Sequence, residues 1–162
     1  MDGYSISGAG LQTGTFPDCN FVSQSHGQPA AGADWTITVP GSGEFWEIVA
    51  VRARFVTSSA VANRFLTFNV KDNVGNVVFN AAFGTAQTAS ITESVCLSPQ
   101  YNATAGDVSS TKITTLPLPE GPYLPGFTIN SSTTAIDTGD QWSQIAVWFR
   151  QYGPDYGPGG TD

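Results

Sequence analysis

The stretch NRFLTFNVKDNVGNVVFNAAF, residues 63–83, carries the clearest structural signal in the sequence. In its first half, Leu66, Phe68 and Val70 alternate with other residues, the period-two pattern of a strand with one buried face. The pentapeptide DNVGN that follows contains the Asp, Asn and Gly residues that tight turns require. The run VVFNAAF then resembles a returning strand. The sequence therefore predicts a β-hairpin over this stretch.

The same alternation of short apolar runs and turn residues extends outward from the hairpin. Strand-like runs occupy residues 34–40, 45–57, 63–72, 77–83, 87–97, 110–119, 125–133 and 141–152. No repeat, heptad or helical pattern interrupts them, and the chain is rich in glycine (18) and proline (10). These features predict an all-β, single-domain antiparallel β-sandwich. About eight strands favour a jelly roll over an up-and-down barrel, since residues 84–110 offer no short turn.

The two ends of the chain differ from this pattern. Residues 1–32 are rich in Gly, Ser, Gln and Ala and are expected to form an extended N-terminal arm, which leaves 33–152 as the sandwich. The tail GPDYGPGGTD, 153–162, is expected to be a flexible end, and 98–109 a loop. The opening MDGYSISGAG lacks the basic and apolar regions of a secretory signal. If Met1 is native, we expect synthesis in the cytoplasm.

Charge and hydropathy exclude several classes of partner. The formal net charge is −7 and only 12% of residues are charged, so the chain lacks the basic stripe that nucleic acid or anionic lipid requires. No apolar run is long enough to cross a membrane. The mix of uncharged polar residues is typical of a large surface that faces other proteins. Cys19 and Cys96 are expected to be free, buried thiols, and a bridge between them is the alternative.

The sequence contains no recognisable catalytic unit. The single histidine, His26, lies in the Gly/Ala/Gln-rich arm, and no nucleophile elbow, P-loop or zinc-protease motif is present. A glycosidase would need a pair of carboxylates in one cleft. Glu44 and Glu47 flank Trp46, but their odd spacing places them on opposite faces of a regular strand, and Glu93 lies alone among polar residues. We therefore expect a protein that is not an enzyme.

Two acidic turns are possible calcium loops. KDNVGN at 71–76 and DTGD at 137–140 offer carboxylates, but neither has the six to eight oxygen ligands of a calcium site. Aspartate and asparagine beside glycine are also what turns require. The turn interpretation is favoured, so no metal and no cofactor is expected.

Two strands are apolar on both faces. In 141–152, Ile145, Val147 and Phe149 form the predicted core face, and the opposite face carries Trp142, Trp148, Arg150 and Tyr152. In 45–57, the opposite face carries Trp46, Arg52 and Arg54, and Arg64 opens the next strand as a rim residue. A second face of Trp and Arg is typical of protein interfaces. Alternatively, the tryptophans pack under the arm, and Arg52 and Arg54 pair across strands with carboxylates such as Asp72 or Asp140.

The order of several segments resembles a known family. FWEIVAVRARFVTS is followed by ANRFLTFNVKDNVGNVVF, then by LPLPEGPYLPGFTI and finally by DTGDQWSQIAVWF. Over about 33–152 this series resembles the small jelly-roll structural proteins of tailed bacteriophages that decorate or cement the capsid. The resemblance implies homo-oligomers, trimers in particular, that bind the major capsid protein at the capsid surface. It brings no catalytic residues.

The sequence thus predicts a virion protein that stabilises the phage head by bridging capsid subunits. A tail or head-fibre component is the alternative within structural roles, and a carbohydrate-binding β-sandwich module is the alternative from another class. The candidate partner interface comprises Trp46, Arg52, Arg54, Arg64, Trp142, Trp148, Arg150 and Tyr152.

Overall fold

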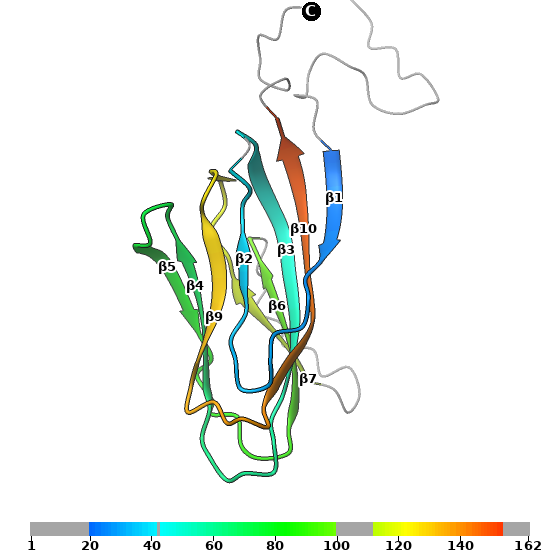
Figure 1. Ribbon diagram of the computed structural model, residues 1–162, viewed down its shortest axis with the longest axis vertical. Helices are drawn as coiled ribbons and strands as arrows, with labels where there is room; N and C mark the ends of the chain where they lie inside the picture. The colour runs from blue at the N-terminus through cyan, green and yellow to red at the C-terminus, as the bar shows by residue number, and fades with distance from the viewer. Residues whose placement is uncertain (1–19, 42, 100–111, 154–162) are drawn as a thin grey trace, which may run out of the picture.

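A computed structural model describes residues 20–41, 43–99 and 112–153. Within these ranges the chain is all-β and contains no helix, and ten strands form two sheets that face each other (Figure 1). The predicted β-sandwich is confirmed. Residues 1–19 of the predicted arm, 100–109 of the predicted loop and 154–162 of the predicted tail lie outside the described residues.

The two sheets differ in size. The six-stranded sheet has the order β1 (Asn20–Ser25), β10 (Gln141–Tyr152), β3 (Phe45–Val56), β6 (Thr92–Ser98) and β7 (Lys112–Pro117), and the short β8 (Pro122–Tyr123) also pairs with β3. The four-stranded sheet has the order β2 (Thr36–Thr38), β9 (Thr128–Thr134), β4 (Phe65–Lys71) and β5 (Val77–Ala82). All pairs are antiparallel except β6 with β7, which is parallel.

The pairing of the strands is nested along the chain. β1 pairs with β10, β2 with β9, β3 with β6 and β4 with β5. In sequence order each pair therefore lies between the strands of the pair before it, and β1 and β10, the first and last strands, enclose all the others. Because β1 and β10 are antiparallel neighbours, Asn20 lies opposite Gln151, and the chain enters and leaves the sandwich at the same end (Figure 1).

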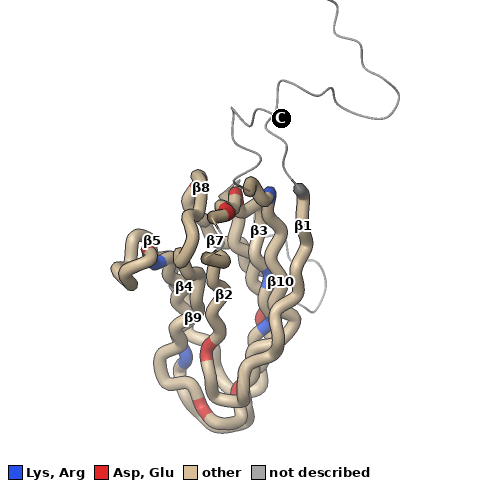
Figure 2. Tube along the Cα trace, turned by 45° about the horizontal axis from the view of Figure 1, so that its top comes forward, with Lys and Arg blue, Asp and Glu red and all other residues tan. Residues whose placement is uncertain are grey.

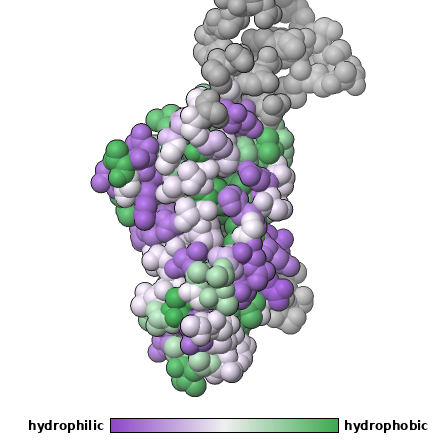
Figure 3. Space-filling model, in the orientation of Figure 1, coloured by the Kyte–Doolittle hydropathy of each residue, from purple (hydrophilic) through white to green (hydrophobic). Residues whose placement is uncertain are grey.

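The predicted hairpin is confirmed as β4 and β5. Asp72 closes its turn, because one carboxylate oxygen accepts hydrogen bonds from the backbone N–H groups of Val74 (3.0 Å) and Asn76 (2.8 Å). Gly75 has a φ of 93°, a left-handed conformation that favours glycine. The hairpin tip and the edge strand β5 expose valine side chains at 74, 77 and 78, which Figure 3 shows as a hydrophobic area.

Two strands were not expected from the sequence. β1 falls inside the predicted arm, so the sandwich begins before residue 33, and β8 is only two residues long. The segment NFVSQS has a single partly buried apolar side chain, Val22, so it lacks the pattern of a core strand. It becomes a strand because β10 offers a free edge. The described residues therefore contain ten strands rather than about eight.

Trp142 occupies the centre of the core between the sheets. Its side chain is fully buried. The distances between ring centroids are 4.6 Å to Phe55, 5.8 Å to Phe68 and 6.2 Å to Trp35. Its indole N–H donates to the carboxylate of Asp34 at 3.2 Å. One side chain from the six-stranded sheet thus contacts residues of both layers, as a sandwich core requires.

Candidate functional site

A β-bulge in β10 changes which residues face outward. Ser143 lies opposite Arg54 and Ala146 opposite Arg52, so two residues of β10 face the single Ala53 of β3. Gln144 in the bulge has a φ of 50°, which such a two-against-one arrangement accommodates. Before the bulge the even position Trp142 points inward, and after it the even positions point outward. The prediction that Trp142 belongs to the outer face was wrong.

A second irregularity in β3 has the same effect. Ile48 lies opposite Phe149 and Ala50 opposite Trp148, so Val49 is the extra residue of this second bulge. Trp46 therefore points inward, where it is buried and stacks on Phe149 with ring centroids 3.7 Å apart. Its predicted place on the outer face was also wrong. A buried indole has no surface to offer a partner.

Arg64 is buried in the sandwich rather than placed at its rim. Its side chain and that of Asp140 are both 0% exposed, and Nε of Arg64 donates to Oδ2 of Asp140 at 2.7 Å. The guanidinium also donates to the backbone oxygens of Ala60 and Ala62 and to the hydroxyl of Ser58. This side chain joins the loop after β3 to the turn before β10, so its role is structural and the predicted rim position is corrected.

Asp140 completes this network from the other side. Its carboxylate accepts from the backbone N–H groups of Ser58 and Asp137, both at 2.7 Å. Burial by itself raises the pKa of Asp140, but the hydrogen bonds from Arg64, Asp137 and Ser58 outweigh it and hold the pKa below the ordinary value of an aspartate. The DTGD segment acts as a turn whose carboxylates bind N–H and O–H groups of the protein.

The low pKa of Asp140 predicts a loss of stability in acid. In the unfolded chain the carboxyl takes up a proton near pH 4, whereas in the folded state it does so at a lower pH. The stabilisation is therefore complete above about pH 4 and disappears as the pH falls through the folded value. Urea unfolding at a series of pH values from 7 to 2.5 measures it. A variant with Arg64→Met and Asp140→Leu should lose less stability over this range, and an equal loss would contradict the assignment.

The remaining candidate residues lie on the outer face of the six-stranded sheet. Arg52 and Trp148 are on neighbouring strands, Arg52 exposed and Trp148 half-buried, and Arg54 is half-buried with a buried Nε that has no hydrogen-bond partner. The ion pairs that join described residues are Arg64 with Asp140 and Arg150 with Glu47. Neither Arg52 nor Arg54 takes part in them, so the alternative in which these two arginines pair with Asp72 or Asp140 was wrong.

Arg150 and Tyr152 form a separate group at the end of the same face. Arg150 donates to Glu47 at 2.8 Å, and the hydroxyl of Tyr152 donates to the other oxygen of Glu47 at 2.9 Å. The ring of Tyr152 stacks on Phe45 at 4.8 Å. Glu47 and Phe45 were not among the predicted site residues, because only the β3–β10 register brings them together.

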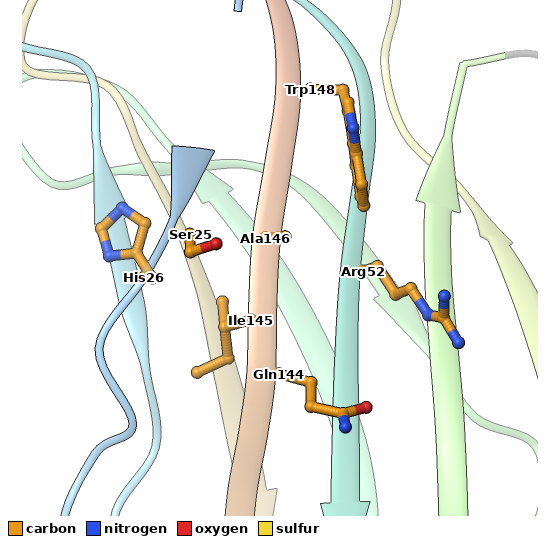
Figure 4. A pocket seen from close by; sticks show the side chains of 7 residues that line it. All are labelled: Ser25, His26, Arg52, Gln144, Ile145, Ala146 and Trp148. Carbon is orange, nitrogen blue, oxygen red and sulfur yellow. The ribbon is translucent and has the colours of Figure 1, made fainter. Parts of the chain in front are cut away.

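A shallow pocket lies on this face between β1 and β3 (Figure 4). It has a volume of about 330 Å³ and is lined by Ser25, His26, Arg52, Gln144, Ile145, Ala146 and Trp148. Figure 4 shows Arg52, Gln144 and Trp148 on one side of β10 and Ser25 and His26 on the other. Arg52 and Trp148 were predicted site residues, whereas Ser25 and Gln144 carried no signal in the sequence.

The other groups considered for chemistry have ordinary structural surroundings. Partial burial lowers the pKa of His26, and its backbone N–H donates to the carbonyl of Ile145. Glu93 is buried and accepts from the hydroxyl of Thr114 at 2.6 Å. Burial raises the pKa of the Cys96 thiol, which the neighbouring Arg52 charge opposes. Cys96 is free, and Cys19 lies outside the described residues.

Residues 20–41, 43–99 and 112–153 contain no group of three or more His, Cys, Asp or Glu side chains that could hold a metal ion. In the same ranges, no helix of the length and hydropathy of a membrane span occurs.

Comparisons with known proteins give no relative for this chain: no family model, curated protein or solved structure matches it.

Proposed function

We propose that this chain is a structural protein of a tailed bacteriophage virion that decorates the head and stabilises it by bridging capsid subunits. The single observation that carries the proposal is the outer face of the six-stranded sheet. It combines an accessible tryptophan with two arginines that have no ion-pair partner among the described residues.

The strand order supports a jelly roll as the finer description of the fold. The four nested pairs, β1 with β10, β2 with β9, β3 with β6 and β4 with β5, correspond to one long hairpin folded over into two sheets. Jelly rolls of eight core strands form viral capsid and lectin domains. In this description β7 and β8 are additions to the edge and the end of one sheet.

The charge distribution supports a protein partner for this face. The chain has a net charge of −7, yet three of its six basic residues, Arg52, Arg54 and Arg150, lie on the outer face. Figure 2 shows basic positions along β3 and β10. Arginine and tryptophan are the residue types that contribute most to protein interfaces. A partner with an acidic surface, the major capsid protein or a second copy, fits this face.

The binding energy would come from a few residues. A contact of about 800 Å² per partner is the usual size of a specific interface, and a few anchors in it contribute most of the affinity. In this chain the anchor is Trp148, with Arg52 and Arg54 fixing its register. Trimers, with each subunit contacting neighbouring capsid proteins, would add such contacts over the whole shell.

The proposal is tested by co-sedimentation of the purified protein with heads of the phage whose genome encodes it. Light scattering measures the oligomeric state of the free protein. We expect an oligomer that binds heads, and Trp148→Ala should weaken this binding about tenfold or more. Val78→Ala, at the exposed edge of the other sheet, is the control and should bind as the parent does. A monomer that does not bind heads would overturn the proposal.

The pocket beside Trp148 favours a second candidate, a carbohydrate-binding module. An accessible indole next to amide, hydroxyl and guanidinium groups is a surface that a sugar ring can stack on and hydrogen-bond to. A glycan array separates the two functions, because a head-binding protein gives no sugar-dependent signal.

A further inference from the structure

The pocket on the outer face is formed by one row of residues across three strands. Ser25 of β1, Ala146 of β10 and Arg52 of β3 lie opposite one another in the register. Ala146 provides a small side chain between two longer neighbours along β10, Gln144 and Trp148, so the row forms a depression (Figure 4). Its volume of about 330 Å³ is near the lower end of the range for small-molecule sites.

The lining of the pocket is complementary to a negative charge. Arg52 is exposed and takes part in neither of the ion pairs between described residues. None of the lining residues is acidic. The side chain of Gln144, which lies on the same side of β10 as Arg52, adds an amide that donates hydrogen bonds (Figure 4). Arg52 and Gln144 can therefore donate hydrogen bonds to a carboxylate that loses part of its hydration shell when it enters the pocket.

We propose that this pocket binds the carboxylate of an acidic side chain, glutamate in particular, that a capsid subunit presents. This inference rests on the proposed function, since it identifies the chemistry of the partner at the centre of the docking face. The guanidinium of Arg52 matches a carboxylate with two parallel hydrogen bonds, which a neutral amide cannot accept. Glutamate has the two methylene groups that can lie against the indole of Trp148, so it is favoured over aspartate.

The test uses a small probe in place of the unknown partner segment. The indole N–H resonances of the isotope-labelled protein are followed by NMR during titration with N-acetyl-glutamate amide, N-acetyl-glutamine amide and glucuronate. We expect a saturable shift of the Trp148 resonance with the glutamate derivative at millimolar concentration. The glutamine derivative, which has the same shape without the charge, should bind at least tenfold more weakly.

Two variants assign the effect to the pocket. Arg52→Gln should weaken the glutamate derivative about tenfold or more, because it removes the charged fork. Lys71→Gln removes the same charge from the four-stranded sheet and should leave binding unchanged. The inference is overturned if the glutamate derivative gives no saturable shift, if both variants behave alike, or if glucuronate binds more tightly than the glutamate derivative.

The same variants keep this inference separate from the proposed function. Arg52→Gln should reduce co-sedimentation with heads, and Lys71→Gln should not. If Arg52→Gln still binds heads as the parent does, the carboxylate pocket fails while head decoration stands. If the glutamate derivative binds at Trp148 but the parent protein does not bind heads, head decoration fails.

Discussion

Replacement of Trp142 by alanine is expected to lower the free energy of unfolding by about 3–5 kcal/mol. The side chain is 0% exposed and packs against Phe55, Phe68 and Trp35, so its removal leaves a large cavity between the sheets. A domain of this kind has a total stability of about 5–15 kcal/mol, so a considerable part of it would be lost. Urea unfolding followed by circular dichroism measures the change.

Trp148 provides the matched control for this prediction. It lies on the same strand as Trp142, six residues further along the chain, but on the opposite face and half-buried. Trp148→Ala should therefore cost about 1 kcal/mol or less. A second variant, Trp142→Phe, retains an aromatic ring and should recover much of the loss. If Trp148→Ala destabilises the protein as strongly as Trp142→Ala, the bulge in β10 is wrongly placed.

Replacement of Arg64 by methionine is expected to destabilise the protein by about 3–5 kcal/mol. The substitution keeps much of the side-chain length but leaves the carboxylate of Asp140 buried without its cation. The backbone oxygens of Ala60 and Ala62 also lose their donor. Because two buried charges depend on each other, loss of either partner costs more than the pair itself contributes. The urea midpoint at pH 7 reports the effect.

The double variant Arg64→Met, Asp140→Leu tests this explanation. Without Asp140 no unpaired charge remains buried at this position, so the double variant should be more stable than either single variant. It should not reach the parent, since the N–H groups of Ser58 and Asp137 lose their acceptor. Matched surface substitutions at Arg150 and Glu47, whose side chains are 46% and 42% exposed, should change stability by about 1 kcal/mol or less. Additive losses in the Arg64 and Asp140 variants would contradict a coupled pair.

The hairpin and the long strands could be predicted because their signals are local. Asp72 and Gly75 are residue types that mark the segment DNVGN as a turn. The alternation of apolar and polar residues on either side of it can be recognised without knowledge of distant residues. The bounds of β10, residues 141–152, also follow from the sequence. Strand β1 was missed because it is polar and depends on the free edge of β10.

The candidate site was harder to predict because it depends on register. Simple alternation places Trp46 and Trp142 outside with Trp148, and the bulges at Val49 and Gln144 reverse this for the first two. Each bulge exists only through the pairing of β3 with β10, which are separated in the chain by residues 57–140. Arg64 is a similar case, since its partner Asp140 lies 76 residues away. Only the tertiary structure reveals that the Arg64 guanidinium is buried in the sandwich and paired with the Asp140 carboxylate.

The common end of β1 and β10 has a mechanical consequence. A force that pulls residues 20 and 151 apart acts on one end of the β1–β10 ladder, whose antiparallel hydrogen bonds lie perpendicular to the strands. These bonds then break one after another, as in opening a zipper, instead of sharing the load. A shell under internal pressure would detach β1 first if it held the domain by these two residues. Load that enters through the outer faces of β3 and β10 avoids this weak direction.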